Sequence, residues 1–304
     1  MKYAIVCGSI NMDLICTTPR IPYPGETIIG WEYHTKEGGK GANQATAISR
    51  LGLSTKMIGC IGRDSFGSSL LHSLRSNNVD TSNVMYADCN TGTAHITVED
   101  SGENNIVVIP SANARLLPEH VFSCEDLIAG AAVAVTQLEI PQITAMEFLR
   151  TAKKHRVFTV LNPSPLPKEG ILEKILSYVD LLVLNETEIK MFTNVFVEDE
   201  SSFRTAAKNL HNKGVQQVVC TLGIKGAYFS ESGRQYYQRA FKVNAVDTTC
   251  AGDSFTGALI LKLLEGTGPE TAMLFAAKAA ALTVTKLGAQ ESLPTIEEIE
   301  SAVW

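Results

Sequence analysis

Short apolar runs that end abruptly in polar residues recur along the chain, and helical stretches separate them. Strands that are apolar throughout and alternate with helices indicate a parallel sheet covered on both faces. The pattern therefore predicts an α/β fold. The predicted strands are Ala4–Cys7, Met57–Ile61, Ala131–Val135, Phe158–Leu161, Leu181–Leu184 and Val218–Cys220, and two of the predicted helices are Ala42–Leu51 and Phe255–Leu264.

Two insertions break this alternation. Residues 91–109 alternate polar and apolar positions around a turn, which is typical of a hairpin with one covered face, and residues 11–37 are also strand-like. We expect these insertions to form a small accessory sheet that covers a ligand, within a single domain spanning residues 1–304. A further hairpin around Ser232-Gly233 is expected to extend the main sheet.

Composition narrows the class of protein. The chain has 304 residues, a formal net charge of -6 and 45% hydrophobic residues, which is enough for a sizeable core. Charge is mixed along the chain, so neither nucleic acid nor a membrane surface is an expected partner. The longest apolar stretch, Leu127–Val135, is far shorter than the ~20 residues of a membrane helix.

Cysteine usage and the N-terminus bear on location. The seven cysteines are scattered without a Cys-x-x-Cys pair, which indicates reduced thiols rather than a disulfide framework. The apolar run at the N-terminus is short and soon reaches Asp13, unlike a signal peptide. We therefore expect a cytoplasmic protein.

Polar residues follow each of the predicted strands. In open α/β sheets, ligands bind outside the carboxyl ends of the strands, so these residues predict a ligand site. For any one of them the commoner explanation is that it caps the next helix. Six such strand ends together favour a site.

The segment from Asp247 to Phe255 runs directly into a long predicted helix. Small residues before a helix start let backbone N–H groups converge on an anion, and the helix dipole favours negative charge there. Asp253 in that position can accept a proton from a substrate hydroxyl while the amides hold a phosphoryl group. The alternative is that Asp253 is only the helix N-cap.

A glycine-rich segment, Gly38-Gly-Lys-Gly-Ala-Asn43, opens another predicted helix. Paired glycines let the backbone approach a ligand closely, while Lys40 and Asn43 supply hydrogen-bond donors. The segment is not a Walker A loop, because Gly41 follows Lys40, and Gln44 stands where the dinucleotide fingerprint needs its third glycine. A flexible surface turn is the alternative.

The segment Asn185-Glu-Thr-Glu188 follows a buried strand. Carboxylate and amide oxygens suit Mg²⁺ held through water and phosphate, although acids at a helix N-terminus are equally ordinary. Carboxylates and amides also bind vicinal hydroxyls well, and these segments hold no arginine cluster for a phosphorylated substrate. An unphosphorylated polyol is the expected acceptor.

Several motifs follow one another in a fixed order along the chain. They are Gly8-Ser-Ile-Asn-Met-Asp13, Pro24-Gly-Glu26, Gly38-Gly-Lys-Gly-Ala-Asn-Gln44, Gln137-Leu-Glu139, Leu161-Asn-Pro163, Asn185-Glu-Thr-Glu188, Thr221-Leu-Gly223, Asp247 to Phe255 and Gly288-Ala-Gln290. Together they resemble the ribokinase-like (PfkB) family of carbohydrate kinases, from Cys7 to about Ser292. The resemblance implies a Rossmann-like three-layer α/β/α fold with a small β-sheet lid that often pairs with a second subunit.

The resemblance also implies an activity. The chain is expected to transfer the γ-phosphoryl group of ATP to a primary hydroxyl of a small unphosphorylated sugar, with ribose to ribose 5-phosphate as the first choice. Deoxyribose, another sugar or a nucleoside is the alternative acceptor. A sugar-binding protein without catalysis is the remote alternative.

The match between these motifs and those of the family also implies roles for individual residues. Asp253 would be the base, and the backbone of Cys250, Ala251 and Gly252 would form the anion hole, with Cys250 where much of the family has glycine. The sugar would contact Asn11, Asp13, Gly39, Lys40, Asn43, Glu139 and Asp253. ATP would contact Asn185, Thr221, Gly223 and Gly252, and Mg²⁺ would lie near Asn185 and Glu188. A monovalent cation, K⁺, would contact Asp247, Thr249, Val284, Leu287, Gly288 and Ser292.

Overall fold

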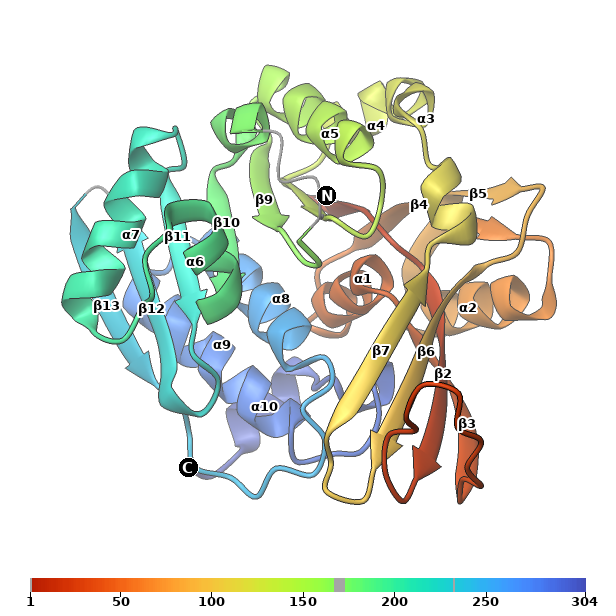
Figure 1. Ribbon diagram of the computed structural model, residues 1–304. Helices are drawn as coiled ribbons and strands as arrows, with labels where there is room; N and C mark the ends of the chain where they lie inside the picture. The colour runs from red at the N-terminus through yellow and green to blue at the C-terminus, as the bar shows by residue number, and fades with distance from the viewer. Residues whose placement is uncertain (1, 167–172, 232) are drawn as a thin grey trace.

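A nine-stranded sheet runs through the centre of the molecule (Figure 1). The structure is a computed structural model that describes residues 2–166, 173–231 and 233–304. Within that part of the chain, the strands of this sheet, in spatial order, are β13 (Arg234–Arg239), β12 (Gly226–Glu231), β11 (Gln217–Thr221), β10 (Leu181–Asn185), β9 (Phe158–Asn162), β8 (Val133–Gln137), β1 (Ala4–Cys7), β4 (Thr55–Gly62) and β5 (Val79–Ala87).

The seven strands from β11 to β5 are parallel to one another. Their carboxyl ends therefore meet at one edge of the sheet, which is where the sequence placed its polar residues. β12 and β13 add an antiparallel hairpin at the other end, as expected, although Ser232 of the turn lies outside the described residues. All six predicted strands are confirmed, and each begins and ends within two residues of the expected bounds.

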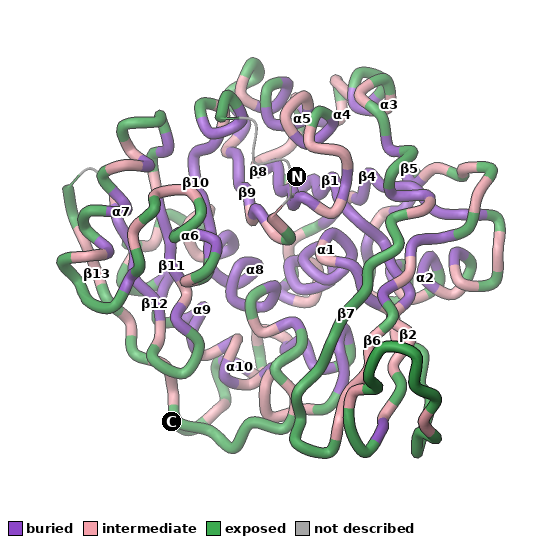
Figure 2. The backbone as a smooth tube through the Cα atoms, viewed as in Figure 1, coloured by how far each residue is buried: buried purple, intermediate pink, exposed green. Residues whose placement is uncertain are grey.

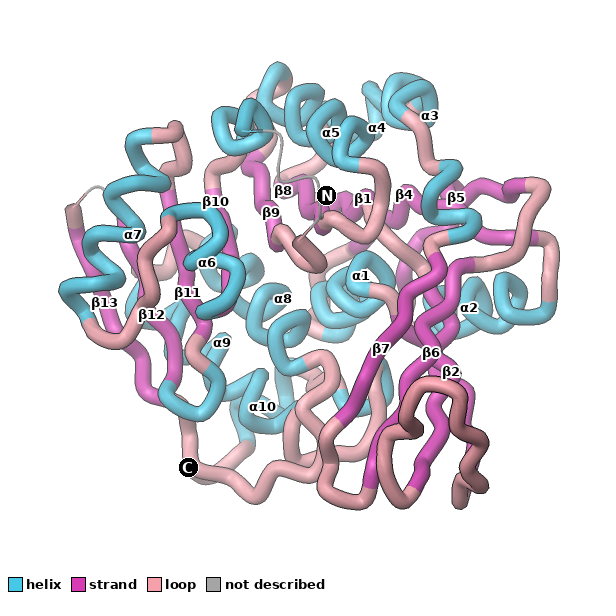
Figure 3. The backbone as a smooth tube through the Cα atoms, in the orientation of Figure 1, coloured by secondary structure: helices cyan, strands magenta, loops and turns pink. Residues whose placement is uncertain are grey.

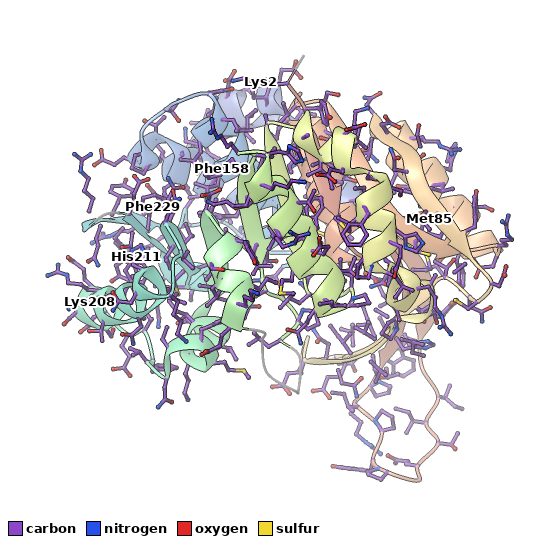
Figure 4. All side chains as sticks on the ribbon, turned by 90° about the horizontal axis from the view of Figure 1, so that it is seen from above. Lys2, Met85, Phe158, Lys208, His211 and Phe229 are labelled. Carbon is purple, nitrogen blue, oxygen red and sulfur yellow. The ribbon has the colours of Figure 1, made fainter. Side chains whose placement is uncertain are left out.

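Helices cover both faces of the sheet, which gives the predicted three layers. The central strand β1 is buried along its whole length, because apolar side chains alternate between the two covered faces (Figure 2). Side chains fill the space between sheet and helices (Figure 4). One face packs on α1 (Lys40–Arg50), α2 (Ser65–Ser76), α8 (Ala251–Leu264), α9 (Pro269–Thr283) and α10 (Ile296–Ser301), and the other on α3 (Pro118–Ser123), α4 (Glu125–Ala129), α5 (Gln142–Lys154), α6 (Glu186–Thr193) and α7 (Glu200–Asn212).

The helices α1 and α8, both predicted, lie side by side in the middle of the molecule (Figure 1). Gly257 of α8 makes this contact close, because a Cβ on it would lie 3.0 Å from the Cβ of Ala47. The two helices begin near the same edge of the sheet. Short 3₁₀ turns complete the described secondary structure: η1 (Ser111–Arg115), η2 (Glu173–Tyr178), η3 (Gly223–Lys225) and η4 (Gln290–Ser292).

A second, four-stranded sheet projects from the body as the predicted lid (Figure 3). Its base lies where Asn11 pairs with Gly38 on one side and with Gly92 on the other. Within the described residues, no helix is both long and apolar enough to cross a membrane. The lid strands, in spatial order, are β3 (Glu32–Gly38), β2 (Asn11–Thr18), β6 (Gly92–Glu99) and β7 (Asn104–Ile109).

Candidate active site

The glycine-rich loop packs tightly against the chain that leaves β1. Gly39 has a φ of 89°, and a Cβ on it would lie 2.6 Å from the backbone nitrogen of Asn11. A Cβ on Gly41 would lie 2.6 Å from the carbonyl carbon of Gly8. Only glycine fits both places. The alternative of a flexible surface turn is therefore wrong.

Glu139, just beyond the end of β8, joins this loop to the base of the lid. Its Oε2 accepts hydrogen bonds from Ser9 Oγ at 2.5 Å and from the backbone N–H of Lys40 at 3.1 Å. The same oxygen accepts from Asn11 Nδ2 at 3.3 Å. The second carboxylate oxygen still has acceptor capacity, as a sugar hydroxyl requires.

Asp13 lies on the lid strand β2, and its carboxyl group faces the same region. Burial raises its pKa to about 7, and the nearby carboxylates Glu139 and Asp253 add to the rise, while Lys40 opposes it. Several acids thus surround one lysine. Such a crowded group of perturbed carboxyls is typical of a functional site.

Asp253 is 7% exposed and occupies the first turn of α8. The N-cap of that helix is Cys250, so the alternative that Asp253 is only the cap is wrong. Its Oδ1 accepts a hydrogen bond from Gln44 Nε2 at 2.9 Å, and its Oδ2 accepts a longer one from Asn43 Nδ2 at 3.5 Å. Burial raises the pKa of Asp253, while Lys40 and these two amides hold the rise down.

Lys40 lies among the acids of both halves of the site. Burial alone would lower its pKa, but the carboxylates of Asp253, Glu139 and Glu188 outweigh burial and raise it. Glu188 belongs to the segment after β10, so its effect on the pKa of Lys40 links the Asn185 turn electrostatically to the glycine-rich loop. The lysine is held as a cation between the expected sugar and nucleotide regions.

The start of α8 offers backbone donors. The first N–H groups of a helix have no partner within it, and the dipole makes this end attractive to anions. Cys250 adopts the left-handed conformation there, with φ of 61°, which glycine adopts at less cost. That conformation gives a physical reason for glycine at this position in much of the family. A Cβ on Gly252 would meet nothing within 4 Å, so the space beside Gly252 is open, while the N–H of Ala251 donates a long hydrogen bond to the carbonyl of Thr248 at 3.3 Å.

The Asn185 segment forms a reciprocal cap at the start of α6. Asn185 Oδ1 accepts from the backbone N–H of Glu188 at 2.8 Å, and Glu188 Oε2 accepts from that of Asn185 at 2.9 Å. The helix-capping explanation is thus confirmed, and any part in binding Mg²⁺ comes in addition to it. Thr221 pairs with Asn185 across β10 and β11, and Gly223 follows at the start of η3 beside open space.

The residues expected around a monovalent cation converge beside the start of α8. Asp247 Oδ1 accepts from Thr249 Oγ1 at 2.6 Å, and its Oδ2 accepts from the backbone N–H of Gly288 at 3.1 Å. Burial alone would raise the pKa of Asp247, but these hydrogen bonds outweigh it and lower the pKa. The carbonyl of Val284 accepts from the backbone N–H of Asp247 at 3.3 Å.

Two of the expected cation ligands, Ser292 and Leu287, can offer only part of their polar groups. Ser292 is buried, but its hydroxyl donates to the carbonyl of Ala289 at 2.7 Å, so its lone pairs rather than its proton remain for a cation. The side chain of Leu287 is 70% exposed, which leaves only its backbone as a ligand.

Sequence reasoning missed a set of amide side chains beside the site, all of them buried except Asn162, which is half-buried. Gln44, Gln137 and Asn162 form a hydrogen-bonded group behind Asp253, and Gln290 donates to Asn43 Oδ1 at 3.2 Å. Asn113 lies under the lid base, where its amide bonds both backbone groups of Ile10 and the side chain of Asn11. Gln44, Gln137, Asn162 and Gln290 stand within the family motifs, and this placement was the sequence signal that could have found them. Asn113 stands in none of these motifs.

The fold and this arrangement of acids, lysine and helix start define a class of protein. The chain matches the model of the pfkB family of carbohydrate kinases over residues 1–296, and it belongs to that family. It is therefore a kinase with a Rossmann-like α/β/α body and a β-sheet lid.

Known proteins of similar sequence narrow the class. The chain is 40% identical over 298 residues to the ribokinase of Haemophilus influenzae, covering 98% of this chain and 97% of that protein. It is 35% identical over 297 residues to the deoxyribokinase of Salmonella typhi, covering 96% of each. The structure of Arabidopsis thaliana ribokinase complexed with ribose and ATP matches it with a TM-score of 0.92 at 30% identity, covering 99% of this chain and 98% of that one.

Proposed function

We propose that this protein transfers the γ-phosphoryl group of ATP to the primary hydroxyl of ribose, forming ribose 5-phosphate and ADP as one kinase domain with a lid. The observation that carries the proposal is the buried Asp253 carboxylate at the donor-rich start of α8, within hydrogen-bonding reach of the glycine-rich loop. The relatives that phosphorylate ribose support the choice of sugar. Deoxyribose is the second candidate, because a deoxyribokinase is also similar over nearly the whole chain.

The sugar hydroxyls are held by the polar groups around the lid base. Asn11 and Asn43 supply amide groups, Asp13 and Glu139 supply acceptors, and Lys40 supplies a charged donor. The backbone of Gly39 lies beside Asn11 and completes this wall. A site that would leave so many buried polar groups unpaired rejects a sugar that lacks the matching hydroxyls.

Transfer begins when Asp253 accepts the proton of the primary hydroxyl. The sugar oxygen forms a bond to the γ-phosphorus, the bond from that phosphorus to the bridging oxygen breaks, and ADP leaves with the electron pair. The N–H groups at Cys250, Ala251 and Gly252 hold the phosphoryl oxygens as charge shifts among them. Phosphoryl transfer depends mainly on such positioning and charge stabilisation.

The residues after β10 and β11 fit ATP with Mg²⁺. The cap uses one oxygen of the Glu188 carboxylate, which has two, so the side chain can still accept from a metal-bound water. Asn185 lies next to Thr221 in the sheet, and the space beside Gly223 is open. Thr221 and Gly223 would contact the nucleotide there. When bound, Mg²⁺ neutralises charge on the β- and γ-phosphates.

The donor set around Asp247 fits K⁺. It consists of oxygens and contains a single carboxylate, which suits a large monovalent cation held by carbonyls and hydroxyls. Burial raises the pKa of Cys250, and the Asp247 carboxylate is one of the charges that add to the rise. When bound there, the cation would supply positive charge near the phosphoryl group.

We also infer that two copies of the chain pair through the lid, in the cytoplasm, where the free thiols of all seven cysteines stay reduced. Trp31 and Tyr33 on the lid are 63% and 58% exposed, and Ile106 and Val107 of the edge strand β7 are 55% and 60% exposed. Large apolar groups on an open edge strand favour association.

The pairing is tested by light scattering at micromolar concentration. The measured mass should be about twice the 32.9 kDa of one chain, and the mass of a monomer would contradict the pairing.

The choice of acceptor is tested by ADP release with a panel of alcohols. With ATP, Mg²⁺ and K⁺ present, we expect kcat/KM to be highest for ribose, lower for 2-deoxyribose, which lacks one hydroxyl, and negligible for adenosine, which carries a bulky base in place of the anomeric hydroxyl. Preference for adenosine would overturn the choice of substrate. Sugar binding without any ADP release would instead indicate a binding protein.

The cation is tested by replacing K⁺ with choline at constant ionic strength. We expect kcat to fall several-fold in choline, because the positive charge beside the anion hole is lost. In Asp247→Asn the rate in K⁺ should fall to nearly the choline level. Equal wild-type rates in the two buffers would remove K⁺ from the account.

A further inference from the structure

Two fully buried glutamines connect the interior of the protein to Asp253. Gln137, at the end of β8, donates from Nε2 to Gln44 Oε1 at 2.6 Å. Gln44, in the first turns of α1, donates from Nε2 to Asp253 Oδ1 at 2.9 Å and to Asn162 Oδ1 at 3.1 Å. Both glutamines are 0% exposed, so water does not compete for these bonds.

The direction of each hydrogen bond in the series from Gln137 through Gln44 to Asp253 is set by the Asp253 carboxylate. An ionised carboxylate only accepts, so Gln44 must present its NH₂ group to it. The carbonyl oxygen of Gln44 then points at Gln137, which must present its own NH₂ group in turn. Asn162 is oriented the same way, because its Nδ2 donates to the carbonyl of Val183 at 2.9 Å and leaves Oδ1 for Gln44.

This orientation leaves one atom without a partner. Gln137 Oε1 is buried, and no described residue donates a hydrogen bond to it. It lies against Gly8, where an added Cβ would sit 2.1 Å from that oxygen, so Gly8 makes room for the amide. A buried carbonyl without a hydrogen-bond partner destabilises the folded state. Turning the amide would place oxygen against Gln44 Oε1, so the fold tolerates the cost to keep the donor pointing toward Asp253.

We propose that Gln44, held in place by Gln137, is a positioning residue that keeps the Asp253 carboxylate ionised and turns its other oxygen toward the sugar hydroxyl. The proposal deepens the proposed function and rests on Asp253 as its base. Of the two amides that reach Asp253, Gln44 is the stronger donor, since its bond is 2.9 Å and that of Asn43 is 3.5 Å.

The physical reason is a balance between burial and hydrogen bonding. Burial raises the pKa of Asp253, and a base that is protonated at neutral pH cannot accept a proton. Hydrogen bonding to the ionised form lowers the pKa again, and Gln44 does this without a charge of its own. The other titratable groups that influence Asp253 stay unchanged in the tests below; they are Lys40, Glu139, Asp13 and Cys250.

The test is Gln44→Glu, which keeps the size of the side chain and replaces the donor by a carboxylate. Two carboxyl groups at hydrogen-bonding distance share a proton, so the pKa of Asp253 should rise by about one unit or more. The acidic limb of kcat against pH, at saturating sugar and ATP, should move up by the same amount. Activity lost at pH 7 should return in part at pH 9.

A second readout does not need turnover. The carboxyl carbon of Asp253 can be followed by NMR titration, with its signal assigned by its absence in Asp253→Asn. We expect the same upward shift in Gln44→Glu. If no sugar is phosphorylated by the wild type, the proposed function fails, and this titration still decides whether Gln44 controls Asp253.

Gln217→Glu is the matched control. Gln217 is a glutamine of strand β11, and its Nε2 donates to the carboxylate of Glu231 at 2.5 Å. Glu231 lies opposite it on the neighbouring strand β12. The control therefore makes the same change of donor to carboxylate beside another acid. It should leave the kcat profile of the wild type unchanged, whatever it costs in stability.

Gln137→Met covers the case in which Gln44→Glu does not fold. Methionine keeps nearly the same volume but cannot hold Gln44, so kcat should fall several-fold with the KM for sugar unchanged. An unmoved acidic limb and titration in Gln44→Glu would overturn the proposal. So would an equal shift in Gln217→Glu, or a Gln137→Met variant that raises KM and leaves kcat intact.

Discussion

The structure depends on one constraint at Asp253. Its carboxylate must be buried to contact Asn43 and Gln44, and it must stay ionised to act as a base. Burial opposes ionisation, and the surroundings compensate with the Lys40 cation and with amide donors from α1. The compensation requires α1 and α8 to start side by side. That in turn requires glycines where the loop before α1 touches the chain after β1. The parallel sheet supplies the platform, because its strand ends meet at this edge.

The fold was largely predictable from the sequence, since fully buried parallel strands have a distinct signature of continuous apolar runs. The lid hairpins were also predictable, because Thr91–Glu99 alternates polar and apolar positions and the structure has β6 there. Two alternatives failed for a reason that local sequence does not contain. The Lys40 loop is held by its close contacts with the chain after β1, and Asp253 accepts hydrogen bonds from α1, whose Asn43 lies 210 residues away in the sequence.

The buried amides show the same limit more sharply. Gln44 and Gln137 stand in quoted motifs, but a glutamine in a sequence gives no hint that it points inward at a carboxylate. Asn113 stood in no motif, although its amide fixes Asn11 at the base of the lid. Such groups become functional only when tertiary contacts orient their donors and acceptors. The Asn185 segment is the reverse case, since the capping chemistry read from sequence is present in the fold.

The most direct test of the central claim is Asp253→Asn, compared with the wild type for kcat and for ribose binding by calorimetry. The substitution keeps the shape of the side chain and removes its ability to accept a proton. We expect a folded protein that binds ribose with affinity close to that of the wild type, with kcat lower by ~10²–10⁴-fold. A variant that turns over ribose at nearly the normal rate would contradict the account.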